Sequence, residues 1–420
     1  MPAQVISLGC RLNIAESDAI AAMLGARDAG VVNSCAVTGE AAKQSRAALR
    51  RARREWPEAE LIATGCAATI DPAAFAGLAD RVVPNAAKLL PASWGVARAV
   101  TPVARHARAF VPVQNGCDHA CTFCIIPQGR GPSVSTPAEA VVERVAALVA
   151  AGHREVVLTG VDLTSYAPAL GPLCERLLAE TRVERLRLSS VDGHEIDPVL
   201  FELLASEPRM MPHLHLSLQA GNDLILKRMK RRHSRMEAVA LVARLKARRD
   251  VAIGADLIAG FPTESDAMAA DTLALLDDCD IVHAHIFPYS PREGTPAARM
   301  PQVAIEVRRE RAARLRAAAA ARKATWLRSL VGTVQDVLVE KPGDRGHSPQ
   351  FAEVRVAPAA VGSLQRVVIV ATDGNTLTSR HPRDSGGQSP TLADSSTAME
   401  VGPRFRGDDE TGGNDERLAG

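Results

Sequence analysis

The sequence GCDHACTFCIIP occupies residues 116–127 and holds Cys117, Cys121 and Cys124 in a C-x3-C-x2-C spacing. A short loop with this spacing can bring three thiolates to one site. Structural zinc takes four protein ligands, and no fourth cysteine or histidine pair follows at the usual spacing, although His119 inside the loop could serve. Three thiolates suit an iron–sulfur cluster better, because one iron then stays open for a non-protein ligand. The loop therefore predicts a cluster that takes part in chemistry.

Three further cysteines, Cys10, Cys35 and Cys66, each end a short apolar run. The runs VISLGC, VVNSC and LIATGC are typical of buried strands, and helix-like sequence follows each of them. In an open parallel sheet the carboxyl ends of all strands lie along one edge, where ligands bind. Three cysteines at equivalent places in this pattern would meet at that edge. They predict a second cluster, the alternative being three small buried core residues.

The C-x3-C-x2-C loop resembles the signature of the radical S-adenosylmethionine (SAM) superfamily, in which this spacing binds a 4Fe-4S cluster whose open iron chelates SAM. The resemblance implies that Cys117, Cys121 and Cys124 are the catalytic cluster ligands. It also implies that Phe123 packs near the SAM adenine, although this aromatic side chain could equally belong to the core.

Together, the two groups of cysteines resemble those of the methylthiotransferases, and the resemblance covers roughly residues 4–380. Members of that family combine an N-terminal domain with an auxiliary 4Fe-4S cluster, a central radical-SAM barrel and a small C-terminal TRAM domain. The resemblance implies two 4Fe-4S clusters, the auxiliary one on Cys10, Cys35 and Cys66. It also implies two SAM molecules per turnover, one for the radical and one for the methyl group.

Four local strings resemble the branch of that family that modifies threonylcarbamoyladenosine at position 37 of tRNA (t6A37): SLGCRLN (7–13), NSCAVT (33–38), GCDHACTFCIIP (116–127) and IFPYSPREGTPA (286–297). The isopentenyladenosine branch usually starts Gly-Cys-Gln-Met-Asn and the ribosomal-protein branch Gly-Cys-Pro-Lys-Asn. The resemblance implies methylthio insertion at C2 of t6A37, with a tRNA anticodon stem-loop, a cellular electron donor and a sulfur source as partners. The alternatives are isopentenyladenosine-37, a ribosomal-protein aspartate, or a non-catalytic metal-containing RNA-binding protein.

Downstream of residue 108, apolar strand candidates alternate with helical patterns. The candidates are residues 110–116, 155–161, 185–191, 213–219, 251–260 and 281–289, and helices are expected at 137–151, 265–278 and 304–330. Such alternation predicts a parallel sheet with right-handed crossovers. Six units suggest a partial (β/α)6 barrel, as in the radical SAM superfamily. The expected class is therefore α/β, with an N-terminal open parallel α/β domain at 1–100 and the barrel at 108–328.

Polar residues at the carboxyl ends of the barrel strands should face the active site. The candidates for contact with SAM or substrate are Gly160, Asp162, Ser190, Gln219, Asp256 and Arg292. Each of them could instead be an ordinary turn residue. Arg292 is the most suggestive, because a guanidinium can bind a carboxylate bidentately. Its expected ligand is the SAM carboxylate or a phosphate.

The residue pattern changes twice in the C-terminal part of the chain. The runs VQDVLVE, FAEVRVA and LQRVVIVATDG predict short strands of a small TRAM-like β-barrel at 329–380, which could help to hold RNA or only pack against the rest. Residues 381–420 are rich in Gly, Ser and Asp and are predicted to be a disordered tail.

Composition limits the partners and the location. Of the 420 residues 46% are hydrophobic and 23% charged, which predicts a globular protein, and the net charge of +2 requires any nucleic acid to bind a local patch. Basic clusters at residues 43–54, 227–249 and 308–328 are candidates, against the alternative of solvated helix faces. The chain start lacks a signal-peptide pattern and no long apolar run occurs, so a cytoplasmic protein without a membrane partner is expected.

Overall fold

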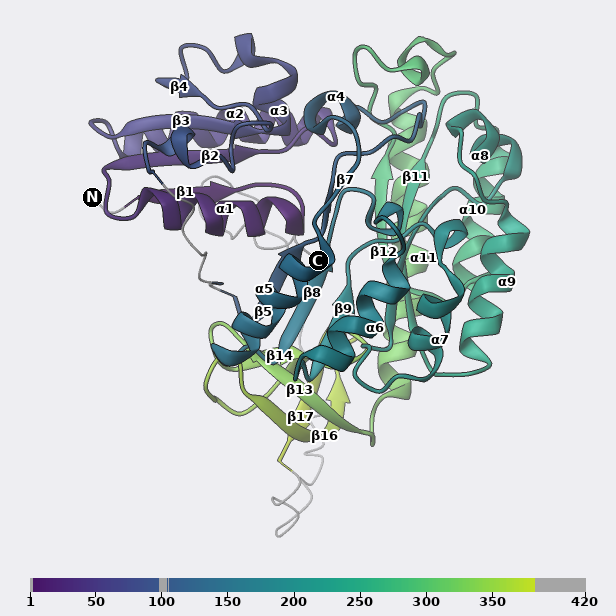
Figure 1. The fold of residues 1–420 in the computed structure, drawn as a ribbon. Helices are drawn as coiled ribbons and strands as arrows, with labels where there is room; N and C mark the ends of the chain where they lie inside the picture. The colour runs from purple at the N-terminus through teal and green to yellow at the C-terminus, as the bar shows by residue number, and fades with distance from the viewer. Residues whose placement is uncertain (1–2, 98–103, 105, 382–420) are drawn as a thin grey trace, which may run out of the picture.

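The N-terminal part of the protein is a parallel sheet with helices packed on it. The structure is a computed structural model that describes residues 3–97, 104 and 106–381 (Figure 1). The sheet has the order β1-β2-β3-β4, with β1 Gln4–Ser7, β2 Ala29–Ser34, β3 Glu60–Gly65 and β4 Arg81–Val82. Its helices are α1 Arg11–Leu24, α2 Gly39–Glu55 and α3 Cys66–Ile70.

Strand register explains why the first three cysteines lie at one edge of this sheet. Ser7 pairs with Asn33 on β2, and Ser34 pairs with Gly65 on β3. Each of the three strands therefore ends at the same level, and a cysteine follows each end within three residues. Parallel pairing thus converts a repeated local pattern into a common site.

The central part consists of two three-stranded parallel sheets, β5-β8-β9 and β10-β11-β12, which lie edge to edge as an open partial barrel flanked by helices. The strands, in spatial order, are β5 Arg108–Pro112, β8 Glu155–Thr159, β9 Arg185–Leu188, β10 His213–Gln219, β11 Ala252–Ala259 and β12 Ile281–Pro288. Two isolated parallel bridges connect the sheets: Leu186 of β9 pairs with Met210, just before β10, and Val191, just after β9, pairs with Leu216 of β10. The helices are α5 Ala138–Ala150, α6 Leu170–Glu180, α7 Pro198–Ser206, α8 Asp223–Met229, α9 Arg235–Lys246, α10 Asp266–Asp278 and α11 Ile305–Ser329. This arrangement confirms the predicted α/β class with a partial barrel.

One predicted strand is wrong in its extent. The run at 110–116 was expected to be a single strand, but β5 ends at Pro112 and a separate strand β6, Gln114–Asn115, pairs antiparallel with β7, Val134–Ser135. The backbone leaves the barrel sheet at Val113 in order to enter the cysteine loop. An apolar run carries no local sign of such a change of partner.

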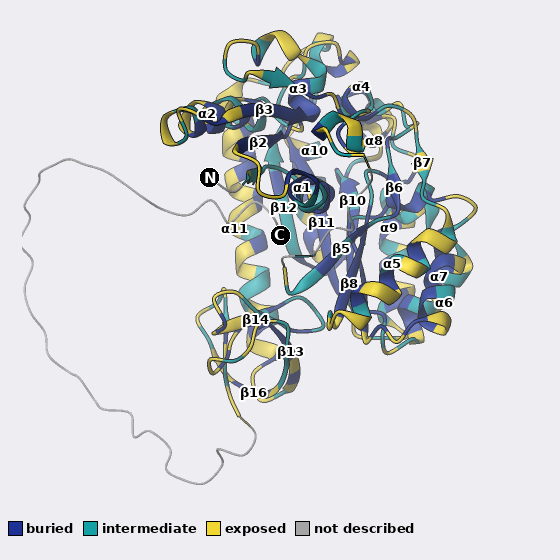
Figure 2. Cartoon of the chain, turned by 60° about the vertical axis from the view of Figure 1, so that its left-hand side comes forward, coloured by how far each residue is buried: buried dark blue, intermediate teal, exposed yellow. Residues whose placement is uncertain are grey.

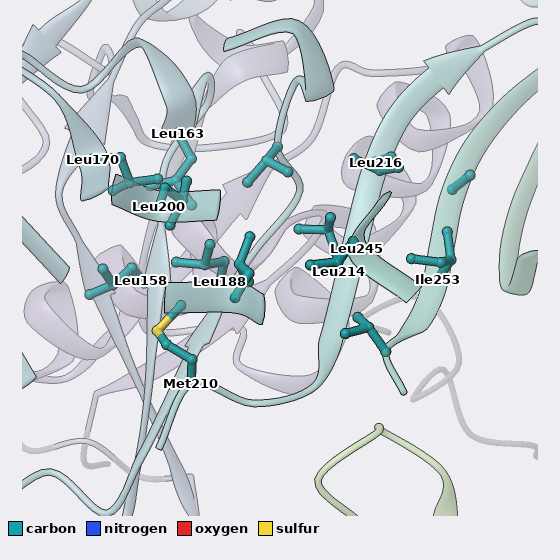
Figure 3. Close-up of a cluster of buried hydrophobic side chains, with 14 of the residues drawn as sticks. Leu158, Leu163, Leu170, Leu188, Leu200, Met210, Leu214, Leu216, Leu245 and Ile253 are labelled. Atoms are coloured by element: carbon teal, nitrogen blue, oxygen red, sulfur yellow. The ribbon is translucent and has the colours of Figure 1, made fainter. Parts of the chain in front are cut away.

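The two faces of the barrel strands differ in polarity because side chains alternate along a strand. In RLRL of β9 and HLHL of β10 the leucines point outward and pack against the surrounding helices, among them Leu200 of α7 and Leu245 of α9 (Figure 3). The arginines and histidines of the same strands lie on the opposite, inner face. The inside of the barrel is therefore polar, while the apolar core lies between the strands and the helices, where Figure 2 shows the buried residues concentrated.

The C-terminal part is a closed five-stranded barrel below the larger one. Its order is β13-β14-β15-β17-β16, with β13 Val334–Glu340, β14 Arg345–His347, β15 Glu353–Arg355, β16 Leu364–Thr372 and β17 Leu377–Arg380 (Figure 1). Arg108 at the start of β5 pairs with Glu340 at 2.8 Å, and Arg185 at the start of β9 donates to the Asp336 carbonyl at 3.3 Å. The small barrel therefore covers the amino-terminal end of the large one.

Two expectations concern other parts of the chain. The tail expected to be disordered, residues 381–420, lies outside the described residues except for His381. Among the described helices, none is long and apolar enough to cross a membrane.

Candidate active site between two cysteine groups

The cysteine loop runs from β6 to α4, Ile126–Arg130, and backbone contacts hold it in place. The Cys117 amide donates to the Gly131 carbonyl at 3.1 Å, and the Cys124 amide donates to the Cys121 carbonyl at 3.2 Å. Gly116 has φ 74°, and a Cβ there would lie 1.8 Å from the Pro132 carbonyl oxygen. The close backbone approach at the start of the loop therefore requires glycine.

The structure brings Cys10, Cys35 and Cys66 together at the carboxyl edge of the N-terminal sheet. Burial, together with the nearby Cys10 and Cys66, raises the pKa of the Cys35 thiol to about 11. Gly9, with φ 97°, leaves room for this approach, since a Cβ there would lie 2.8 Å from the Cys35 sulfur. We call these three residues the N-terminal triad and Cys117, Cys121 and Cys124 the loop triad.

The two triads face each other where α3 meets α4. The Asn85 side-chain amide donates to the Cys66 sulfur at 3.5 Å and to the Gly129 carbonyl at 2.6 Å. A Cβ on Gly129 would lie 3.3 Å from the Cβ of Cys66. Burial raises the pKa of Cys124 to about 11, and both Cys121 of its own triad and Cys66 of the other contribute to the rise. The two thiol groups thus form one continuous site.

The spacing of the thiols suits a multi-iron cluster better than a single zinc ion. Around one zinc with bonds of about 2.3 Å in tetrahedral geometry, sulfurs lie roughly 4 Å apart. Among the described residues, no group of three possible ligand atoms that all lie within 4.8 Å of one another contains two cysteines. The group that includes His119 joins it to Cys117 and Asp162 instead. His119 therefore does not complete a zinc site with the three thiols of its loop.

The remaining two cysteines lie away from both triads. Cys174 in α6 and Cys279 after α10 are fully buried in the barrel core, as expected for packing residues. All eight cysteines are free thiols. Each triad therefore offers three thiols, and the raised pKa values of Cys35 and Cys124 mean that metal binding must release protons there. The donor sets fit clusters that each keep one iron open.

Two of the predicted rim residues lie directly beside the loop triad. The Asp162 carboxylate is 3.6 Å from the Cys117 sulfur and 3.1 Å from His119 Nε2, and Ser165 Oγ donates to it at 2.6 Å. Gln114 Oε1 accepts from the Asp162 amide at 2.9 Å, and a Cβ on Gly160 would lie 2.8 Å from the same oxygen. Gln114, which sequence reasoning missed, thus positions this loop.

Arg231 is a second residue that sequence reasoning did not single out. Its guanidinium donates to Asp192 and to the Ser217 carbonyl, both at 2.8 Å, and its other terminal nitrogen is 3.7 Å from the Cys121 sulfur. The sequence placed it only within the basic cluster at 227–249. Arg231 therefore links the sulfur of Cys121 to the end of the barrel strand β10.

The other predicted contacts are spread around the barrel rim. Phe123 packs edge-on against Phe261 with ring centroids 6.4 Å apart, beside Cys124. Gln219 ends β10 in a left-handed conformation, with φ 67°, and Ser190 is half-buried after β9. Among the described residues, neither Gln219 nor Ser190 forms a side-chain hydrogen bond with Asp162.

Arg292 and Asp256 lie elsewhere. A Cβ on Gly39 would be 3.6 Å from an Arg292 terminal nitrogen, and Cys35 is within electrostatic range of that guanidinium. Arg292 therefore lies on the side of the N-terminal triad. Asp256 lies inside the barrel, where its Oδ1 is 3.1 Å from both His215 Nε2 and His285 Nδ1.

Comparisons with known proteins agree with this geometry. The model of the Radical SAM superfamily matches residues 111–276, and that of the "Uncharacterized protein family UPF0004" matches residues 3–83. A radical SAM methyltransferase, TsrM from Kitasatospora setae, solved with tryptophan and a SAM analogue, superposes with a TM-score of 0.50 at 15% identity, covering 64% of each chain. That likeness concerns the fold alone.

Three curated relatives align with nearly the whole chain. The threonylcarbamoyladenosine tRNA methylthiotransferase MtaB of Rickettsia prowazekii (strain Madrid E) is 40% identical, covering 88% of this chain and 95% of the relative. The protein of the same name from Chlamydia pneumoniae is 34% identical with the same coverage. The tRNA-2-methylthio-N(6)-dimethylallyladenosine synthase of Novosphingobium aromaticivorans is 32% identical, covering 90% and 96%.

The fold and the three-cysteine loop define a radical SAM enzyme, which uses a 4Fe-4S cluster and SAM. Within that class, the chain belongs to the methylthiotransferase family. The predicted family and enzyme class are confirmed, and a non-catalytic RNA-binding protein is excluded. The second cluster and the role of each site residue stay predictions.

Proposed function

We propose that this enzyme inserts a methylthio group at carbon 2 of threonylcarbamoyladenosine-37 in tRNA. The observation that carries the proposal is the proximity of the two triads, because Cys66 packs against Gly129 of α4, the helix that follows Cys124, and Asn85 bridges the two. Methylthio insertion needs removal of a hydrogen and delivery of sulfur at the same carbon, so two sulfur-ligated sites must lie side by side. Two relatives that align with 88% of this chain, at 40% and 34% identity, carry a name with this substrate.

The loop triad is proposed to hold the cluster that binds SAM. When bound, the cluster and SAM supply the one-electron chemistry that breaks an unactivated C–H bond. Asp162 and His119 beside Cys117 offer a carboxylate and an imidazole to the polar groups of SAM. Phe123, Phe261 and Tyr289 form an apolar wall next to Cys124, which excludes water from the reacting atoms.

The N-terminal triad is proposed to hold the auxiliary cluster from which sulfur is delivered. Cys10 is exposed, whereas Cys35 and Cys66 are buried. A group held by these three thiols would therefore be open on the side of Cys10. Arg292 and Arg46 add positive charge near Cys35, which favours a negatively charged cluster there.

The tRNA backbone is proposed to bind the basic face of α2. Lys43, Arg50, Arg51 and Arg54 on this helix are exposed, and none forms an ion pair within the described residues. The cluster at 308–328 is a weaker candidate than expected, because Arg308 and Arg311 are buried and bind the Tyr289 carbonyl and Glu264. Phosphates need accessible cations, which α2 offers. The electron donor, the sulfur source and the cytoplasmic location stay predictions.

Dimethylallyladenosine-37 is the second candidate substrate, because a relative named for it is 32% identical over 90% of this chain. Mass spectrometry of tRNA nucleosides from a strain that lacks the gene separates the two. We expect 2-methylthio-t6A to disappear and t6A to accumulate, and the wild-type gene but not a Cys121→Ala variant to restore the product. Loss of the methylthio dimethylallyl nucleoside instead would show that the second candidate is correct.

A further inference from the structure

Arg11 extends from the N-terminal domain into the polar interior of the barrel. It is the first residue of α1, directly after Cys10, and α1 packs against β5. Its guanidinium lies 5.6 Å from the centroid of the Phe351 ring, which Arg108 of β5 and Arg187 of β9 also approach, at 4.8 and 5.0 Å. Three guanidinium groups from three elements thus gather around one aromatic ring.

The carboxylates near Arg11 are already engaged by other partners. Glu155 pairs with Arg187 at 2.7 Å and with Arg185 at 2.9 Å, and Glu340 pairs with Arg108 at 2.8 Å. Asp256 accepts from two histidine rings. Among the described residues, Arg11 forms no hydrogen bond and no close ion pair; its guanidinium lies over the face of Phe351, and Glu155 and Asp256 attract it only from beyond ion-pairing distance. Arg11 is therefore a cation without a directly paired carboxylate.

The surroundings of Arg11 remain open to a ligand. Arg11 is only partly buried, and the side chains of Asp256 and His285 keep 24% and 38% of their surface exposed, although the deeper His215 and Arg187 are almost wholly buried. Asp256 holds Nδ1 of His285, which leaves Nε2 of that ring unengaged by any described residue. The barrel interior thus presents a partly buried cation and, on His285, an imidazole that keeps 38% of its surface exposed.

These groups match the substituent that distinguishes the two candidate nucleosides. The threonylcarbamoyl group on N6 of adenine ends in a carboxylate and carries a hydroxyl, whereas the dimethylallyl group is an uncharged hydrocarbon. Carbon 2 and the carbon that bears N6 flank N1 on the same edge of the adenine ring, so a residue that recognises the N6 substituent must lie on the same side of the site as the group that delivers sulfur. Arg11 follows Cys10 directly in the chain, so its side chain extends into the barrel from the N-terminal triad itself.

We propose that Arg11 binds the threonyl carboxylate of the target nucleoside and so determines the choice of threonylcarbamoyladenosine over dimethylallyladenosine. The inference rests on the proposed function. Binding of the carboxylate supplies the counter-ion that Arg11 lacks and leaves Phe351 as a flat support for the guanidinium. A hydrocarbon in the same place would leave the cation unpaired and partly desolvated, which disfavours the alternative nucleoside.

The test pairs a change in the enzyme with a change in the substrate. Wild-type and Arg11→Gln enzymes, reconstituted anaerobically with iron and sulfide, are assayed on an anticodon stem-loop that carries t6A and on the same RNA with the threonyl carboxylate converted to its methyl ester. We expect the wild type to prefer the acid by on the order of 100-fold in kcat/KM and in RNA affinity. The Arg11→Gln variant should lose that preference and bind both RNAs as weakly as the wild type binds the ester.

Controls separate recognition from damage to the neighbouring Cys10 site. The iron content should be equal in the wild type and in Arg11→Gln. A second variant, Arg176→Gln on the exposed side of α6, should keep the preference of the wild type for the acid. Equal losses on acid and ester in Arg11→Gln would overturn the inference and assign Arg11 a structural role. If the wild-type enzyme converts the acid and the ester equally well, the inference about Arg11 is overturned and the proposed function stands. If the wild-type enzyme is active only on RNA that carries dimethylallyladenosine, both the inference and the proposed function are overturned.

Discussion

Arg130 and Glu16 form a buried bidentate ion pair that joins the loop triad to the N-terminal sheet. Arg130 lies at the end of α4, Glu16 lies in α1, and the two nitrogen–oxygen distances are 2.9 and 3.0 Å. Lys88 contacts the same carboxylate at 2.5 Å, and all three side chains are about 1% exposed. Because α1 starts directly after Cys10 and α4 follows Cys124, this pair sets the relative position of the two triads.

Breaking this pair should destabilise the protein strongly. Glu16→Gln leaves Arg130 and Lys88 buried without a counter-ion, and we expect a loss of about 3–5 kcal/mol in the free energy of unfolding. Urea unfolding of the iron-loaded protein measures it. Arg176→Gln breaks an exposed ion pair with Glu180 and serves as the control, which should leave the unfolding midpoint nearly unchanged. Similar midpoints for the two variants would contradict the structural role of Glu16.

The two triads should fail in different ways when a thiol is removed. Cys121→Ala removes a ligand of the loop triad, so we expect no 5′-deoxyadenosine from SAM. Cys35→Ala should still cleave SAM but form no methylthio product. Each variant should bind about four irons, compared with about eight in the wild type. Wild-type product yield in Cys35→Ala would refute the assignment of the N-terminal triad to sulfur delivery.

Gly9 offers a test of the N-terminal triad that leaves every cysteine in place. Gly9→Ala would put a Cβ 2.8 Å from the Cys35 sulfur, and we expect it to displace that thiol and lower the iron content to about half. Gly152→Ala is a matched control, since Gly152 has φ 94° against 97° for Gly9 but no atom within 4 Å of the added Cβ. Both variants carry backbone strain of about 1–2 kcal/mol. A difference in iron content between them therefore reports the steric clash between the added Cβ and the Cys35 sulfur. Equal iron in both would contradict the proposed packing.

Glu155 should contribute stability that depends on pH. Burial raises the pKa of Glu155, but Arg187 and Arg185 outweigh it and lower the pKa to about 2 from the ordinary 4.5. A carboxylate with a lowered pKa in the folded state contributes fully above about pH 4.5, and the contribution is lost as the pH falls towards about 2. We expect Glu155→Gln to cost on the order of 3 kcal/mol at pH 7.

Denaturant unfolding of wild type and Glu155→Gln across this range checks the prediction. The difference in stability should be constant above pH 4.5 and shrink below it. Glu58→Gln, at an exposed carboxylate before β3, should show no comparable loss. A difference that stays the same down to pH 3 would attribute the loss to packing alone.

Much of the site could be predicted from the sequence because its signals are local. The spacing of Cys117, Cys121 and Cys124 is a short-range pattern, and the β-then-α rhythm before Cys35 and Cys66 implies a shared sheet edge through parallel pairing. Strict alternation in RLRL and HLHL likewise determines that the leucines and the charged residues occupy opposite faces of the barrel strands. These are properties of neighbouring residues and of backbone periodicity.

Tertiary structure alone decided the contacts between residues distant in the sequence. Gln114 supports Asp162, Arg231 reaches Cys121, and Arg292 lies beside Cys35 rather than the loop triad. None of these follows from periodicity, because each depends on how the barrel, the cysteine loop and the N-terminal sheet pack together. The same holds for Arg11, whose charge is visible in the sequence, whereas its lack of a directly paired carboxylate results from Glu155, Glu340 and Asp256 all being engaged by other residues.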